Sequence, residues 1–122
     1  MVDATDLSGR RVLIVEDDFY LANDAERAFR AAGAQVVGPL PRSGLALDAL
    51  ARDGVDAAVV DINLGEGLSF ELADALKAAG VPFVIVTGYD EVLIPERLAD
   101  VATVQKPADM RAVVQAVAAL IA

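Results

Sequence analysis

Short apolar runs alternate with segments of helical periodicity along this chain. The apolar runs predict buried strands, which lie at residues 11–15, 35–38, 56–61, 81–87 and 101–105. Between and after them, apolar residues recur at helical spacing. This spacing predicts helices over residues 19–32, 43–52 and 68–79, a short or irregular helix around Pro95, and a last helix from Asp109 onward. Strand and helix therefore alternate regularly through the whole sequence.

Local signals indicate where these helices begin and end. Gly33 and Gly80 follow the first and third helical segments, and glycine favours the left-handed conformation that closes a helix. Ser43 and Asp109 can cap the second and last helices with a side-chain oxygen. The residues expected to face inward are Leu47, Leu50 and Ala51 in the second helix, and Val113, Val114, Val117 and Leu120 in the last.

The order of elements predicts the fold class. Wholly apolar strands joined by helices are typical of a parallel sheet that is covered on both faces. We predict an α/β fold, a doubly wound (βα)5 flavodoxin-like sandwich with a five-stranded parallel sheet. A length of 122 residues suits a single domain over residues 1–122, with residues 1–9 as an N-terminal extension. Since the last helix ends the sequence, no attached output domain is expected.

Composition narrows the chemistry that the chain can perform. Cys and His are both absent, which excludes disulfides, imidazole-based zinc sites and Ser-His-Asp or Cys-His catalysis. The net charge of −9 disfavours binding to nucleic acid. No apolar run approaches the roughly 18–20 residues of a membrane span, and the N-terminus lacks an apolar signal segment. We therefore expect a soluble cytoplasmic protein that uses carboxylates, hydroxyls, amines or a hard metal ion.

Polar side chains gather at the carboxyl ends of the predicted strands, where doubly wound sheets bind their ligands. They are Glu16, Asp17 and Asp18 after the first strand, Asp61 in the third, Thr87 in the fourth and Lys106 after the fifth. Convergent carboxylates repel one another, and Mg²⁺, which prefers oxygen ligands, relieves that repulsion. Each residue alone is explained as a helix cap, a turn or a surface residue. Their joint placement favours a phosphoryl-transfer site, in which a carboxylate acts as nucleophile.

The segments VLIVEDD, VVDINL, VTGYD and QKP, in this order and spacing, resemble the receiver domains of two-component response regulators. The similarity spans roughly residues 10–122. It implies that Asp61 accepts a phosphoryl group. It also implies that Mg²⁺ is held by Glu16, Asp17 and Asp61, with the backbone carbonyl of Asn63 as a further ligand.

The resemblance implies roles for residues of the last two motifs as well. Thr87 matches the switch hydroxyl that turns toward the phosphoryl group, and Lys106 matches the lysine that pairs with the acyl phosphate. Pro107 matches the structural proline that follows this lysine, often after a cis peptide bond. Some positions depart from the family pattern. Glu16 replaces the more frequent Asp, and Thr103 stands where most receivers carry Tyr or Phe.

Residues 82–90, PFVIVTGYD, resemble the receivers named for a "FAT GUY" motif, known from alphaproteobacteria. Gly88 lacks a Cβ and so leaves room for water or a phosphoryl donor to reach Asp61. In that group Tyr89 is a possible switch aromatic, in place of the aromatic missing at Thr103. A solvent-exposed loop tyrosine is the alternative explanation of Tyr89. The subgroup suggests a role in stress-response phosphorelays.

The resemblance implies that the donor is a histidine on a sensor histidine kinase, of the HWE or a related type, or on a histidine phosphotransfer protein. A stand-alone receiver then binds a downstream protein partner or drains phosphate from a kinase, as a monomer or a weak phosphorylation-dependent dimer. A degenerate receiver that binds partners without phosphorylation is one alternative. A phosphatase with an aspartyl nucleophile is less favoured, because it usually needs a second acid where this chain has Asn63. A flavodoxin-like cofactor binder is disfavoured, because EDDFY would repel a phosphate. We expect no enzyme activity.

Overall fold

The computed structural model describes residues 6–62, 70–88 and 94–121. Its five strands form one parallel sheet in the order β2-β1-β3-β4-β5. The strands are β1 (Arg11–Val15), β2 (Gln35–Leu40), β3 (Ala57–Asp61), β4 (Phe83–Thr87) and β5 (Ala102–Gln105). The helices are α1 (Phe19–Ala31), α2 (Ser43–Arg52), α3 (Glu71–Ala78) and α4 (Met110–Ile121). The predicted α/β fold with a five-stranded parallel sheet is confirmed.

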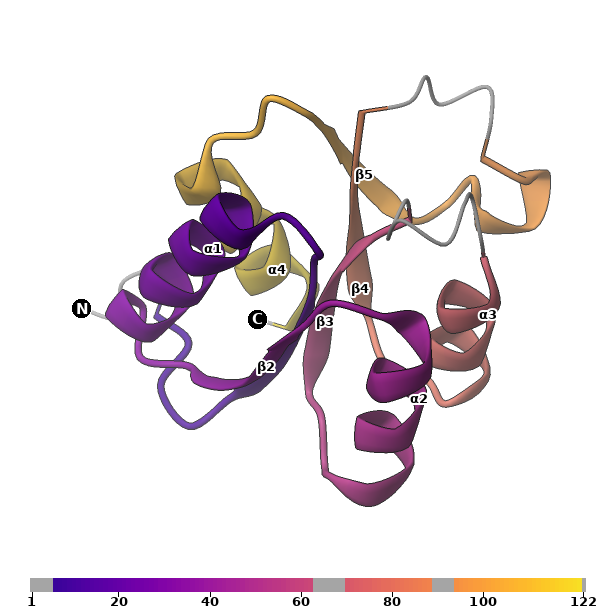
Figure 1. Cartoon of the computed structure of the whole chain (residues 1–122), viewed down its shortest axis with the longest axis horizontal. Coiled ribbons are helices and arrows are strands. Elements are labelled where there is room, and N and C mark those ends of the chain that lie inside the picture. Colours follow the sequence, from indigo (N-terminus) through magenta and orange to yellow (C-terminus); the bar gives the residue numbers. More distant parts are fainter. Residues whose placement is uncertain (1–5, 63–69, 89–93, 122) are drawn as a thin grey trace.

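Two helical layers enclose the sheet. In Figure 1, α1 and α4 lie on one side of the strands and α2 and α3 lie on the other. Side chains alternate between the faces of a strand, so Val12 and Ile14 of β1 pack beneath α1 and α4, while Leu13 and Val15 pack beneath α2 and α3. Because both faces are covered, β1, β3 and β4 are apolar except at one terminal residue each, which is Arg11, Asp61 or Thr87.

The first edge strand is less buried than the central strands. β2 lies at one edge of the sheet, and its residues are half-buried or exposed.

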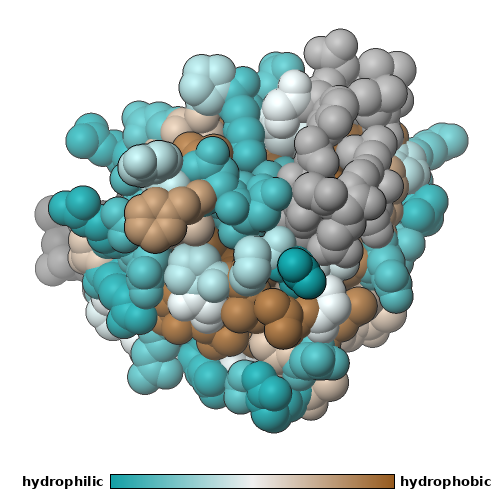
Figure 2. Space-filling view, in the orientation of Figure 1, coloured by the Kyte–Doolittle hydropathy of each residue, from teal (hydrophilic) through white to brown (hydrophobic). Residues whose placement is uncertain are grey.

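On the face seen in Figure 2, hydrophilic side chains predominate and hydrophobic side chains gather toward the lower middle. None of the helices in the described parts of the chain is long and apolar enough to cross a membrane.

The prediction that Ala51 and Leu120 face inward is wrong, because both are exposed. In α2 the buried residues are Ala46 and Ala49, whereas Ala51 is exposed. In α4 the three valines are buried as predicted, but Leu120 is 41% exposed. The buried stripe of α4 continues through Ala118, and Ile121 packs against the same core, so that Leu120 lies at the margin of the stripe.

The helix ends follow the predicted signals with one shift. Asp109 accepts a hydrogen bond from the Arg111 N–H at 2.9 Å, which confirms it as a capping residue. Ser43 was predicted to cap α2, but it is the first residue of this helix and Arg42 occupies the N-cap position. The helix therefore begins one residue earlier than predicted. Between β4 and β5, the described residues form a 3₁₀ turn at Glu96–Leu98 (η2), which agrees with the short or irregular helix predicted from Pro95.

The turn after α1 requires a glycine. Gly33 has a φ of +94°, and a Cβ added there would lie 2.6 Å from Ser8 Oγ. We expect Gly33→Ala to lower the free energy of unfolding by about 1–2 kcal/mol, measured by urea denaturation. Gly80→Ala is the matched control, because Gly80 has a φ of +72° but open space around its Cβ. Equal losses in the two variants would contradict the steric contribution of Ser8.

Candidate functional site

Two central strands bring the predicted acidic residues together. β1 and β3 are neighbours in register, with Val15 opposite Val60, so that Glu16 and Asp61 come next to each other at their carboxyl ends. Asp61 is 3% exposed and Glu16 is 9% exposed, whereas Asp17 is exposed. One carboxylate oxygen from each of these three residues lies within 4.8 Å of the other two. The predicted convergence of the acids is therefore observed.

Lys106 reaches this acidic cluster from the far side of β4. Its backbone N–H donates to the Thr87 carbonyl at 2.7 Å, which fixes the start of the loop after β5. Its Nζ lies 2.9 Å from Asp61 Oδ2 and 3.0 Å from Glu16 Oε1. One ammonium group thus contacts two buried carboxylates, one at the end of β3 and one directly after β1. The Lys106–Pro107 peptide bond is cis, as the resemblance implied.

Burial governs the electrostatics of the site. Burial, followed by the hydrogen bond with Asp61, raises the pKa of Glu16 from 4.5 to about 7. The Asp18 N–H, which donates to Glu16 Oε2 at 3.1 Å, and the Lys106 ammonium oppose this rise in pKa. Burial alone would lower the pKa of Lys106, but hydrogen bonds to Asp61 and Glu16 outweigh it and raise that pKa. Lys106 therefore keeps its positive charge, but one ammonium group does not balance a cluster of three acids. This excess of acidic groups favours the binding of a further cation.

The donor set fits a magnesium ion. Glu16, Asp17 and Asp61 offer only oxygen atoms, and their spacing lets one cation contact all three carboxylates. Asp18 is outside this cluster, because its side chain caps α1 by accepting a hydrogen bond from the Leu21 N–H at 3.0 Å. Asn63, the fourth predicted ligand, lies outside the described residues. The metal-binding roles therefore stay predictions that the geometry permits.

Thr87 and Gly88 lie beside the acidic cluster. Asp61 is opposite Val86 in the register of β3 and β4, and Thr87 follows as the last residue of β4. Thr87 is fully buried. A Cβ added at Gly88 would meet nothing within 4 Å, so the space next to Thr87 is open as predicted from the glycine. Tyr89 lies outside the described residues, and its role as a switch aromatic stays a prediction.

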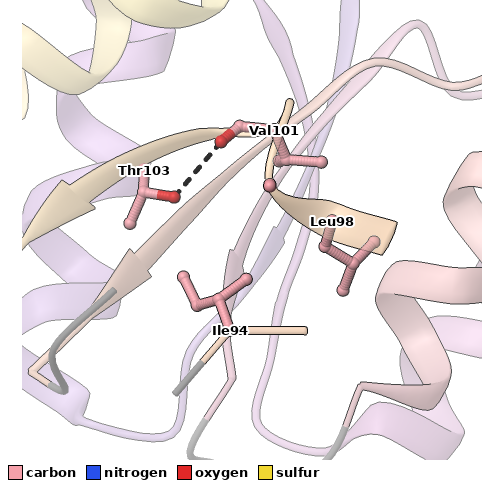
Figure 3. A pocket seen from close by; sticks show the side chains of 5 residues that line it. Ile94, Leu98, Val101 and Thr103 are labelled. Atoms are coloured by element: carbon pink, nitrogen blue, oxygen red, sulfur yellow. Dashed lines mark hydrogen bonds between the residues drawn. The ribbon is translucent and has the colours of Figure 1, made fainter. Parts of the chain in front are cut away.

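The small side chain of Thr103 borders a cavity that sequence reasoning did not predict. Thr103 lies on β5, and its hydroxyl donates to the Val101 carbonyl at 3.2 Å (Figure 3). Together with Ile94, Leu98 and Ala99, these two residues line a cavity of about 170 Å³. Apolar cavities of roughly 150 Å³ accept a benzene molecule. The volume of the cavity is therefore close to that of one aromatic ring, at the position where the resemblance implies a tyrosine or phenylalanine in most receiver domains.

This cavity should accept the missing ring. We expect Thr103→Tyr to change the free energy of unfolding by less than about 1 kcal/mol, because the new ring fills existing space. Val104→Tyr is the control, since Val104 points to the opposite face and packs against the core beneath α1 and α4. Overpacking there should cost about 1–3 kcal/mol. Similar losses in both variants, measured by urea denaturation, would show that the cavity does not admit a ring.

Comparison with solved structures identifies the family. SdrG from Sphingomonas melonis Fr1 is 34% identical, with a TM-score of 0.79, and the match covers 99% of this chain and 100% of that chain. The response regulator PhyR from Brucella abortus matches at 24% identity and a TM-score of 0.84, over 97% of this chain and 50% of PhyR. A CheY-like receiver domain from Methylobacillus flagellatus matches at 24% identity and a TM-score of 0.76, over 93% of this chain and 98% of that domain. No family model and no curated protein matches the chain.

The fold, the acidic cluster and these matches agree on one class of protein. The chain belongs to the receiver domains of response regulators. Such domains are typically signalling domains without enzymatic activity, they interact with kinases or downstream partners, and they usually bind Mg²⁺ at an acidic cluster. This chain has a group of three acids, formed by Glu16, Asp17 and Asp61, at the carboxyl end of its sheet.

Proposed function

We propose that this chain is a response regulator that accepts a phosphoryl group on Asp61 in a Mg²⁺-dependent reaction. The observation that supports the proposal most strongly is the position of the Asp61 carboxylate. It is nearly buried, it adjoins two other carboxylates, and it lies 2.9 Å from the Lys106 ammonium. The donor that suits an aspartate acceptor is a phosphohistidine on a sensor histidine kinase or a phosphotransfer protein.

In this reaction a carboxylate oxygen of Asp61 attacks the phosphorus atom, the phosphorus–nitrogen bond breaks, and the donor imidazole leaves with the electron pair. Lys106 neutralises charge on the phosphoryl oxygens, and the Thr87 hydroxyl turns to donate a hydrogen bond to one of them. Bound by Glu16, Asp17 and Asp61, Mg²⁺ would supply positive charge to the same oxygens. The open space at Gly88 lets the donor approach.

Phosphorylation adds negative charge and strong hydrogen-bond acceptors at the edge of the sheet. The shift of Thr87 and Lys106 toward these oxygens then biases a pre-existing equilibrium that a downstream protein detects. Draining phosphate from the kinase is the other available output. The FAT GUY-like segment at residues 82–90 supports a donor kinase of the HWE or a related type and a role in stress signalling. We propose a monomer, or a weak dimer that forms on phosphorylation.

Labelling with a small phosphodonor tests this function. The protein is incubated with Mg²⁺ and acetyl phosphate, and its intact mass is measured. We expect one phosphoryl adduct that is stable to acid, labile to base and lost when EDTA removes Mg²⁺. No adduct at saturating Mg²⁺ would favour a degenerate receiver that binds partners without phosphorylation. Turnover of exogenous phosphoesters would instead indicate a phosphatase.

A further inference from the structure

Two ion pairs join α3 to the segment that precedes β5. The Arg97 guanidinium donates to Asp74 at 2.8 and 2.9 Å, and the Lys77 ammonium lies 2.9 Å from Asp100. In α3 the acid comes three residues before the base, and in the other segment the base comes three residues before the acid. A shift of three residues would therefore pair like charges, so the two ion pairs fix one alignment. We call these two ion pairs the clamp, and residues 94–100, which it holds, the strap.

The strap lies over the cavity of about 170 Å³. Ile94, Leu98 and Ala99 of the strap line this cavity together with Thr103 of β5 (Figure 3). Unfilled space inside a protein costs free energy, because the side chains around it lose van der Waals contacts. A movement of the strap toward β5 would restore such contacts. The clamp opposes this movement, because it ties the strap to α3.

The clamp is a restraint that a signal can overcome. Its four side chains are 45–73% exposed, so that solvent screens both ion pairs. Two exposed ion pairs of this kind together change an equilibrium by a factor of about 2–30. An effect of this size biases a choice between two positions of the strap without fixing it.

The strap is continuous with the strand that leads to the proposed acceptor site. Asp100 is followed by β5, which begins at Ala102, and β5 is followed by Lys106. The Lys106 ammonium lies 2.9 Å from Asp61, and the Lys106 N–H donates to the Thr87 carbonyl. A phosphoryl group that changes the contacts of Thr87 and Lys106 therefore acts on the end of β5, while the clamp acts on the segment before its start.

We propose that the clamp is a regulatory restraint that keeps the strap away from β5, and that phosphorylation of Asp61 favours release of the clamp and closure of the strap over Thr103. This inference rests on the function proposed above. Because coupling between two events is reciprocal, a change that favours the closed strap also favours the phosphorylated protein. Loss of the clamp should therefore increase phosphorylation, and a side chain that fills the cavity should prevent this increase.

Removal of the two acids of the clamp tests the restraint. The variant combines Asp74→Asn with Asp100→Asn. The ratio of phosphorylated to unphosphorylated protein is measured by intact mass, with Mg²⁺ and a fixed, subsaturating concentration of acetyl phosphate. We expect this ratio to rise about threefold or more. The control, Asp24→Asn combined with Asp48→Asn, removes two exposed carboxylates outside the clamp and should leave the ratio within about twofold of wild type.

A filled cavity distinguishes closure of the strap from a general loosening of the fold. Thr103→Tyr places a ring in the space that the closed strap would occupy. In a Thr103→Tyr background, loss of the clamp should therefore change the ratio by less than about twofold. An unchanged ratio in the variant that lacks only the clamp would overturn the inference, and so would an equal rise in the Thr103→Tyr background.

NMR spectroscopy follows the strap without any phosphodonor. Nuclear Overhauser effects between the methyl groups of Ile94 and Thr103 report how closely the strap approaches β5. They should be stronger in the variant that lacks the clamp than in the wild type, and equal intensities would overturn the inference. If acetyl phosphate does not label even the wild type, the proposed function fails, and this measurement still shows whether the clamp holds the strap open.

Discussion

Asp61→Asn is expected to abolish the Mg²⁺-dependent phosphoryl adduct formed with acetyl phosphate, leaving only the unmodified intact mass. The substitution keeps the size and shape of the side chain but replaces the attacking carboxylate by an amide, which is a poor nucleophile toward phosphorus. The fold should survive, because Lys106 keeps its second ion pair, at 3.0 Å to Glu16. Circular dichroism and a urea melt check this.

A neighbouring acid provides the matched control for Asp61. Asp18→Asn also removes one carboxylate close to the site, but Asp18 caps α1 and is not in the cluster of three acids. Asparagine also caps helices well, so we expect this variant to fold and to form the adduct. An adduct that persists in Asp61→Asn would assign the acceptor to another acid and contradict the proposed role of Asp61.

The layout of the sheet was predictable because the strand pattern and the helix pattern have different periods. β1, β3 and β4 are buried on both faces, so each strand is an apolar run with a single polar residue at one end. The amphipathic helices between them leave only a parallel arrangement with crossovers. The margins of the helices were harder to predict. Leu120 continues the apolar spacing of α4, yet its exposure depends on where the end of α4 lies relative to the sheet.

The geometry after β4 depends on tertiary ion pairs. Arg97 donates two hydrogen bonds to Asp74 of α3, at 2.8 and 2.9 Å, and Lys77 lies 2.9 Å from Asp100. Each pair joins residues 23 positions apart, so no local pattern in the sequence reveals it. Pro95 indicated an irregular helix, but not that α3 would hold the turn that follows.

The acidic cluster was predictable in membership but not in its interactions. Strand order placed Glu16, Asp61 and Lys106 at one edge of the sheet because carboxyl ends of parallel strands meet there. Sequence gave no sign that Lys106 contacts both acids, or that burial shifts the pKa of Glu16. Asn63 and Tyr89 lie outside the described residues, and their predicted roles stand as predictions.

Glu16 should make the stability of the metal-free protein fall as the pH rises. Its pKa is 4.5 in the unfolded chain and about 7 in the folded protein. Between these two values the folded protein holds a proton that the unfolded chain has released, so rising pH favours unfolding. Above pH 7 both states are ionised, and the full cost of about 3 kcal/mol is present. In EDTA, the free energy of unfolding of Glu16→Gln should therefore exceed that of the wild type increasingly from pH 5 to pH 8.

Magnesium should oppose this loss of stability, because a cation in the cluster replaces the proton that Glu16 loses. Millimolar Mg²⁺ is expected to raise the melting temperature of the wild type more at pH 8 than at pH 5.5, and to raise that of Glu16→Gln less. Glu26→Gln, which removes a carboxylate from an exposed ion pair on α1, controls for the change in net charge. If Glu26→Gln differed from the wild type in stability by the same amount and with the same pH dependence as Glu16→Gln, the effect would come from overall charge. The buried carboxyl of Glu16 would then not be its source.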